Sequence, residues 1–158
     1  MNITLLGIGN ILMQDEGVGV HVVRYIQEHY HTPGLEIVDG GTAGLSLLPY
    51  IEARERLLVV DAVDFDQEPG YIGILRQDAI PAFFGTKASL HHLGLMDVLA
   101  AARLLDQAPQ EICLIGIQPH TLALGLELTE VLQAKMPALI ASVIGQLQQW
   151  GIDCRPVA

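Results

Sequence analysis

The 158-residue chain is poor in positive charge: 8 Lys and Arg residues face 18 Asp and Glu residues, which gives a net charge of −10 with neutral histidines. No basic cluster occurs along it, so nucleic acid and anionic membrane surfaces are not expected partners. The sequence also lacks an apolar run of the roughly 20 residues that cross a bilayer. A strand pattern begins as early as Ile3, so we expect no cleaved leader.

The sequence has only two cysteines and none of the common hydrolase motifs. The two cysteines, Cys113 in an apolar strand pattern and Cys154 near the end, make no disulfide framework. Free thiols fit a reducing compartment, and we expect the cytoplasm. The sequence has no G-x-S-x-G, no H-E-x-x-H, no Walker loop and no C-x-x-C. Carboxylates and histidines therefore remain as candidate functional groups.

The apolar pattern predicts alternating strands and helices. Hydrophobic residues make up 51% of the chain and charged ones only 16%, as expected for strands covered on both faces. Residues 80–90, with Pro81 and Gly85, look like a long loop of the active-site type. The predicted strands are 3–6, 35–39, 57–61, 71–75 and 112–117; the predicted helices are 18–30, 45–51, 93–105 and 129–150, the last interrupted near Pro137.

These elements predict one three-layer α/β domain over residues 1–158, with helices on both faces of a mostly parallel, twisted five-stranded sheet. Right-handed crossovers favour the strand order second, first, third, fifth, fourth, with the fourth strand as the candidate antiparallel one. The order reverses beside the first strand, where open α/β sheets bind ligands. Glu16 follows the first strand, Asp39 ends the second and Asp61 ends the third, so three carboxylates should border one crevice.

The glycine turn after the first strand does not fit a dinucleotide. Gly7-Ile8-Gly9 begins as G-x-G-x-x-G does, but Leu12 stands where the third small residue is needed. Asp15 and Glu16 would also repel a phosphate at the start of the following helix. This turn favours a cation. Asp15 is predicted to cap the helix N-terminus, the commonest role of an aspartate there.

Histidines could complete a metal site with these acids. His91 and His92 lie at a loop-to-helix junction, whereas the other four follow helix or surface patterns. Two carboxylates and one imidazole at a cleft suit Ni, Zn, Mn or Fe and leave coordination positions open for a substrate.

At these residues the chain resembles the hydrogenase maturation endopeptidases, which process the large subunit of [NiFe] hydrogenases. The resemblance spans nearly the whole length as linked motifs: Gly7-x-Gly9-Asn10, Asp15-Glu16-Gly17-x-Gly19, Asp39-Gly40-Gly41-Thr42, Asp61-Ala62 and Ser89-x-His91. By this resemblance, Glu16, Asp61 and His91 correspond to the three residues that contact metal and act in catalysis in the family. His92 is the neighbouring alternative, and the motif favours His91.

The resemblance implies an aspartic-type endopeptidase that removes the C-terminal extension of a large-subunit precursor after nickel insertion. The precursor supplies the nickel, although other divalent ions could occupy the site. Three chemical roles stay open: nickel polarises the scissile carbonyl as a Lewis acid, nickel only positions the peptide, or Glu16 or Asp61 activates a water as general base.

Substrate binding is expected at Asp39, Gly40, Gly41 and Thr42. The glycines and the threonine would shape a backbone groove for an extended peptide, and Asp39 would either hold the turn or bind substrate. A monomer is expected. Two alternatives stay open, a nickel-binding accessory protein without peptidase activity and a Rossmann-like nucleotide-dependent enzyme that uses Gly7 and Gly9.

The assignment of the imidazole gives a first prediction. His91→Ala should abolish processing of a nickel-loaded large-subunit precursor, because it removes one of three ligands, while His92→Ala should retain most of it. Electrophoresis of the precursor before and after incubation measures both. The reverse result would move the assignment by one residue, and activity in both variants would exclude a histidine from the site.

Overall fold

The computed structural model describes residues 2–85 and 90–157, and of residues 90–94 it describes only the backbone. A five-stranded sheet has the order β3-β1-β4-β6-β5, in which β5 alone runs antiparallel to its neighbour. This confirms the predicted order. The small β2-β7 sheet was not predicted. The strands are β1 (Ile3–Ile8), β2 (Tyr30–His31), β3 (Leu35–Gly41), β4 (Arg56–Ala62), β5 (Ile72–Arg76), β6 (Glu111–Ile117) and β7 (Arg155–Pro156).

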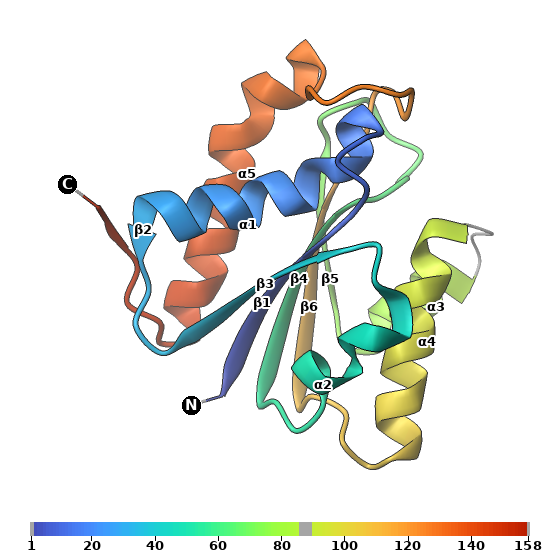
Figure 1. Ribbon diagram of the computed structural model, residues 1–158, viewed down its shortest axis with the longest axis vertical. Helices are drawn as coiled ribbons and strands as arrows, with labels where there is room; N and C mark the ends of the chain where they lie inside the picture. The colour runs from blue at the N-terminus through green and yellow to red at the C-terminus, as the bar shows by residue number, and fades with distance from the viewer. Residues whose placement is uncertain (1, 86–89, 158) are drawn as a thin grey trace.

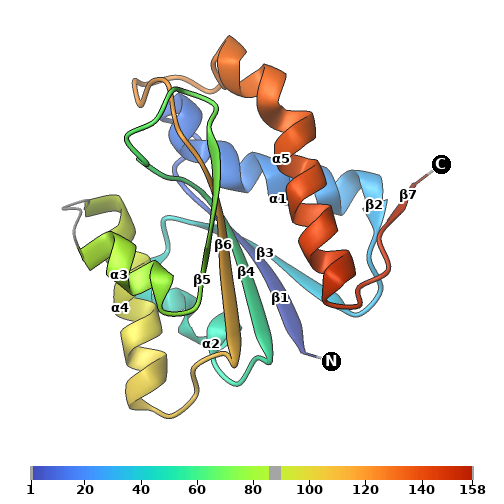
Figure 2. The same cartoon turned by 180° about the vertical axis from the view of Figure 1, so that it is seen from behind.

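Helices cover both faces of the sheet (Figure 1, Figure 2). α1 (Val18–His29) and α5 (Glu130–Gln149) lie on one face. α2 (Leu48–Ile51), α3 (Ala79–Gly85) and α4 (Leu90–Leu104) lie on the other. Two 3-10 turns, η1 (Gln14–Gly17) and η2 (Gly44–Leu47), lead into α1 and α2. In the described part of the chain no helix is long and apolar enough to cross a membrane.

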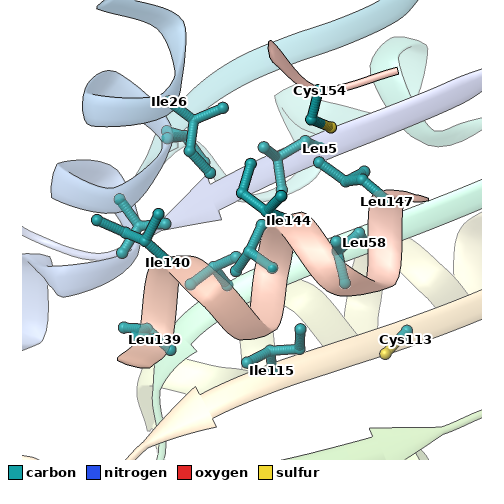
Figure 3. Packing of buried hydrophobic residues seen from close by; sticks show 14 of the residues in the cluster. Leu5, Ile26, Leu58, Cys113, Ile115, Leu139, Ile140, Ile144, Leu147 and Cys154 are labelled. Carbon is teal, nitrogen blue, oxygen red and sulfur yellow. The ribbon is translucent and has the colours of Figure 1, made fainter. Parts of the chain in front are cut away.

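Each face of the sheet has its own core, because successive side chains of a strand point to opposite faces. Leu58 and Val60 of β4 pack with α1 and α5, whereas Leu57 and Val59 pack with the helices of the other face. Figure 3 shows the first core, where Ile140, Ile144 and other α5 residues lie over Leu5, Leu58 and Ile115. Cys113 is fully buried there, as its apolar context predicted.

Two predictions about prolines were wrong. Of the predicted loop 80–90, residues 80–85 belong to α3, Leu90 begins α4, and residues 86–89 lie outside the described residues. α3 forms because Pro81 sits in the first turn, where no intrahelical N–H bond is lost, and because Ile80 and Phe84 bury one face. α5 continues through Pro137 without interruption. Pro137 lies on the exposed side of the helix, and Gln133, whose carbonyl loses its amide partner, is exposed as well.

Glycines allow α1 to approach the sheet at backbone distance. A Cβ built on Gly19 would lie 2.1 Å from the Val60 carbonyl oxygen and 2.6 Å from that of Ile8. A Cβ on Gly7 would lie 2.4 Å from the Gly19 carbonyl oxygen. Backbone atoms occupy these positions, so no side-chain rotation could make room. The first turn of α1 is thereby held against the carboxyl ends of β1 and β4.

This contact predicts a large cost for one added methyl group. Gly19→Ala should lower the free energy of unfolding by about 3 kcal/mol, since the clash is with fixed backbone. Gly145→Ala is the matched control, because Gly145 lies on α5 with open space around it. That variant should gain up to about 1 kcal/mol. Urea denaturation followed by circular dichroism measures both, and wild-type stability in Gly19→Ala would refute the tight crossing.

Candidate active site

The predicted carboxylates lie at the carboxyl edge of the parallel strands. Glu16 belongs to η1, directly after β1 and its glycine turn. Asp61 is the next-to-last residue of β4, and Asp39 lies near the end of β3. Because β3, β1 and β4 are neighbours in the sheet, all three acids border the same corner of the molecule.

Backbone packing fixes Glu16 and Asp61 relative to one another. Gly9 has a φ of 135°, and a Cβ on it would lie 1.9 Å from the Glu16 carbonyl oxygen. Its N–H donates to the Gly41 carbonyl at 2.9 Å, which ties this turn to β3. One helical turn beyond Glu16, Gly19 contacts the carbonyl of Val60, the residue before Asp61. These backbone contacts hold Glu16 and Asp61 near the same end of the sheet, and the crevice that the two side chains are expected to share stays a prediction.

The two carboxylates differ in their surroundings. Asp61 is fully buried, and its Oδ1 accepts a hydrogen bond from the Ala62 N–H at 2.8 Å, which orients the carboxylate. Glu16 is only partly buried. A buried carboxylate is costly unless hydrogen bonds or a cation compensate it. The site thus offers one oriented, buried acid and one accessible acid, and a carboxylate of either kind can accept hydrogen bonds or bind a cation.

Asp15 does not cap α1, and that prediction was wrong. The N-cap position is Gly17, without a side-chain hydrogen bond, because the chain enters α1 through the η1 turn. The Asp15 carboxylate is instead fully buried and points to the segment between β6 and α5. It accepts hydrogen bonds from the N–H groups of His120 (2.8 Å), Thr121 (3.2 Å) and Thr129 (2.8 Å), and from the Thr129 hydroxyl (2.9 Å).

These partners of Asp15 could not be read from the local sequence. They lie 105 to 114 residues later in the chain. Their effect is to hold the long β6-α5 loop against the residue that precedes Glu16. Asp15 is therefore a positioning residue, a role that its neighbours in the sequence did not indicate.

Asp39 is paired with Arg24 of α1, a second partner that the sequence did not indicate. The Asp39 Oδ2 accepts from the Arg24 Nε at 2.9 Å and lies 2.8 Å from its Nη2. The turn after β3 is closed by backbone atoms, with the Ala43 N–H donating to the Gly40 carbonyl at 3.0 Å. The Asp39 carboxylate thus contacts Arg24, and its role in binding substrate stays a prediction.

Two hollows meet at Asp39. One, of about 320 Å³, lies over the glycine turn and is lined among others by Asn10, Leu12, Arg24 and Thr42. The other, of about 560 Å³, follows the outer edge of β3 from Glu36 to Gly40, with Tyr50 of α2 on its far side. β3 is an edge strand of the sheet. The two hollows share Asp39 in their linings, and the first is also lined by Gly9, which packs against the backbone of Glu16.

His91 and His92 lie in the first turn of α4. Their side chains, and the whole of Ser89, are outside the described residues, so the choice between the two imidazoles stays a prediction. Among the side chains that are described, no three His, Cys, Asp or Glu residues gather as a metal-binding group. His91, the predicted third ligand, is one of the residues whose side chains are not described.

Burial favours the uncharged forms of three further side chains, those of His21, Cys113 and Cys154. Desolvation, followed by the nearby Arg24 charge, lowers the pKa of His21, whose Nε2 is buried without a hydrogen-bond partner among the described residues. Burial raises the pKa of Cys113 and also that of Cys154, where the Asp153 charge adds to the effect. Protonated thiols are poor nucleophiles, so cysteine catalysis is disfavoured.

The Asp15 cluster predicts a strong dependence of stability on this carboxylate. Asp15→Ala should lower the free energy of unfolding by about 3 kcal/mol, because it leaves several buried N–H groups without an acceptor. Asp153→Ala is the control: its ion pair with Arg155 at 2.7 Å is exposed and should contribute about 1 kcal/mol or less. Thermal unfolding of both variants by calorimetry tests this, and equal small losses would contradict the anchoring role.

Comparison with known proteins identifies the family of this chain. Residues 20–146 match the HycI family of hydrogenase maturation proteases. The hydrogenase 2 maturation protease of Escherichia coli is 39% identical over 158 residues, covering 99% of this chain and 96% of that protein. The hydrogenase expression/formation protein HupD of Rhodobacter capsulatus is 42% identical, with 96% and 73% covered.

Solved structures give the same result. The hydrogenase maturating endopeptidase HybD from E. coli superimposes with a TM-score of 0.94 at 38% identity, covering 99% of this chain and 98% of that one. The [NiFe] hydrogenase maturation protease HybD from Thermococcus kodakarensis has a TM-score of 0.76 at 28% identity, with 92% and 99% covered. The chain belongs to the hydrogenase maturation protease family.

Proposed function

We propose that this protein is an endopeptidase that removes the C-terminal extension of a [NiFe] hydrogenase large-subunit precursor after nickel has been inserted. Glu16, Asp61 and His91 contact the nickel that the precursor carries. The observation that supports this best is the backbone packing of Gly9 on Glu16 and of Gly19 on Val60, which holds two carboxylates at one corner. The proposed enzyme works as a single chain in the cytoplasm, where its two free cysteines would stay reduced.

The donor set suits nickel as part of the substrate. Carboxylate oxygens and an imidazole nitrogen are acceptable ligands for Ni²⁺, and three of them leave positions for the precursor's own ligands. In the absence of substrate, the site should bind divalent ions only modestly for the same reason. Nickel then reports that the precursor is loaded, and it is not a resident cofactor of the enzyme.

Hydrolysis also needs a group that accepts a proton from water. Glu16, which is partly accessible, is the better candidate for general base, because Asp61 is buried and its Oδ1 is held by the Ala62 N–H. In this scheme water attacks the scissile carbonyl, its proton passes to Glu16, and Glu16 returns a proton to the amine that leaves with the extension. Nickel and Asp61 hold the peptide in line with that water.

The hollows along β3 suit an extended peptide. The edge of a sheet offers backbone groups to a further strand, and such pairing is a common way to bind peptides. The precursor tail would run beside β3 and reach the catalytic corner past Asp39, Gly40, Gly41 and Thr42, which gives these residues the substrate-binding role expected from the sequence. The Arg24–Asp39 ion pair would mark the point where the tail turns toward Glu16.

Charge-neutralising variants test the carboxylates. Glu16→Gln and Asp61→Asn should each reduce processing of a nickel-loaded precursor at least about 100-fold, because shape is kept while metal contact or proton transfer is lost. Glu28→Gln, on the exposed side of α1, is the control and should process normally. Mass spectrometry of the precursor measures the released extension.

The same assay separates the endopeptidase from a nickel-binding accessory protein. An accessory protein would bind the loaded precursor but release no peptide, even as the wild-type chain. Normal processing by a folded Glu16→Gln or Asp61→Asn variant would exclude the assigned residue.

A further inference from the structure

Four leucines project into solvent beside the catalytic corner. Leu124 is 84% exposed and Leu126 65% exposed, and Leu12 and Leu122 are each about half exposed. We call these four residues the leucine ridge. Leu124 and Leu126 lie in the segment between β6 and α5, and Leu12 lies between β1 and η1. Both segments are at the carboxyl edge of the sheet (Figure 1).

The ridge has a firm support. The Gly125 N–H donates to the Leu12 carbonyl at 2.9 Å, and the Gln14 N–H donates to the Gly125 carbonyl at 2.9 Å. A Cβ on Gly125 would lie 2.7 Å from the Gln14 side chain, so the two segments pack closely. Beneath them the Asp15 carboxylate holds both ends of the long loop, at His120 and Thr129. The leucines are thus presented on a braced loop.

Internal packing does not account for this arrangement. Exposed apolar side chains gathered in one place mark interaction sites more often than scattered ones do. The β6-α5 connection is also longer than the two to six residues usual between strand and helix, and such loops tend to be functional. Because Asp15 precedes Glu16 directly, the ridge is held at a fixed distance from the candidate catalytic carboxylate.

We propose that the leucine ridge docks an apolar surface on the body of the large-subunit precursor. This rests on the proposed function, since a protein substrate must cover the face around Glu16. Glu127 and Glu130, both exposed, border the ridge and favour basic residues at the rim of that surface, as does the net charge of −10. The ridge supplies affinity, and the acids at the corner supply chemistry.

The test compares two leucine pairs of similar exposure. The ridge variant is Leu124→Ser with Leu126→Ser. The control is Leu104→Ser with Leu105→Ser: Leu104 is 88% exposed, and this pair lies at the end of α4, at the opposite edge of the sheet (Figure 1, Figure 2). Binding of the nickel-loaded precursor is measured by calorimetry, and cleavage by single-turnover assays at saturating enzyme.

The ridge variant should bind the precursor at least about tenfold more weakly, because each leucine loses burial. Its single-turnover rate at saturation should equal that of the wild type, and the control pair should match the wild type in both. Wild-type affinity in the ridge variant, or equal losses in both pairs, would overturn the proposal. A wild-type dimer that dissociates in the ridge variant would also overturn it, by showing that the ridge binds a second copy.

These outcomes are distinct from a failure of the proposed function. If that function is wrong, the wild-type protein itself leaves the loaded precursor uncut. If only the docking proposal is wrong, the wild type cleaves the precursor and the ridge variant cleaves it with unchanged affinity.

Discussion

The contact between the first turn of α1 and the ends of β1 and β4 is the constraint on which the rest of this structure depends. Gly7 and Gly19 remove the side chains that would otherwise separate helix and sheet, so that backbone meets backbone at Val60. Gly9 extends the same close packing to Glu16. Because these contacts involve main-chain atoms, the packing of helix on sheet fixes the backbone positions of Glu16 and Asp61.

Hydrogen bonds to the Asp15 carboxylate hold the loop between β6 and α5 at the same corner. Asp15 exchanges its hydration for hydrogen bonds with three N–H groups and a hydroxyl, which fixes the segment between β6 and α5. Its neighbour Glu16 then lies between a glycine-packed helix start and a braced loop that carries exposed leucines. In our account, the same few residues define both the chemistry and the face that meets the substrate.

Sequence patterns predicted much of this, for physical reasons that are local. Short apolar patterns bounded by turn residues identified the five strands, the clearest being the unbroken run before Asp61, and right-handed crossovers then gave their order. α3 was missed because Pro81 was read as a breaker, although a first-turn proline is compatible with a helix. The partners of Asp15 and Asp39 were missed because they are distant in sequence, and no pattern near either acid encodes them.

The proposed cleavage of a nickel-carrying hydrogenase precursor can be tested in one experiment. Purified large-subunit precursor, with and without nickel, is incubated with the wild-type protein and analysed by intact-mass spectrometry. We expect that only the nickel-loaded precursor loses the mass of its C-terminal extension, and only when the protein is present. Equal cleavage of the nickel-free precursor would contradict recognition of nickel by Glu16, Asp61 and His91, and an intact loaded precursor would contradict the endopeptidase itself.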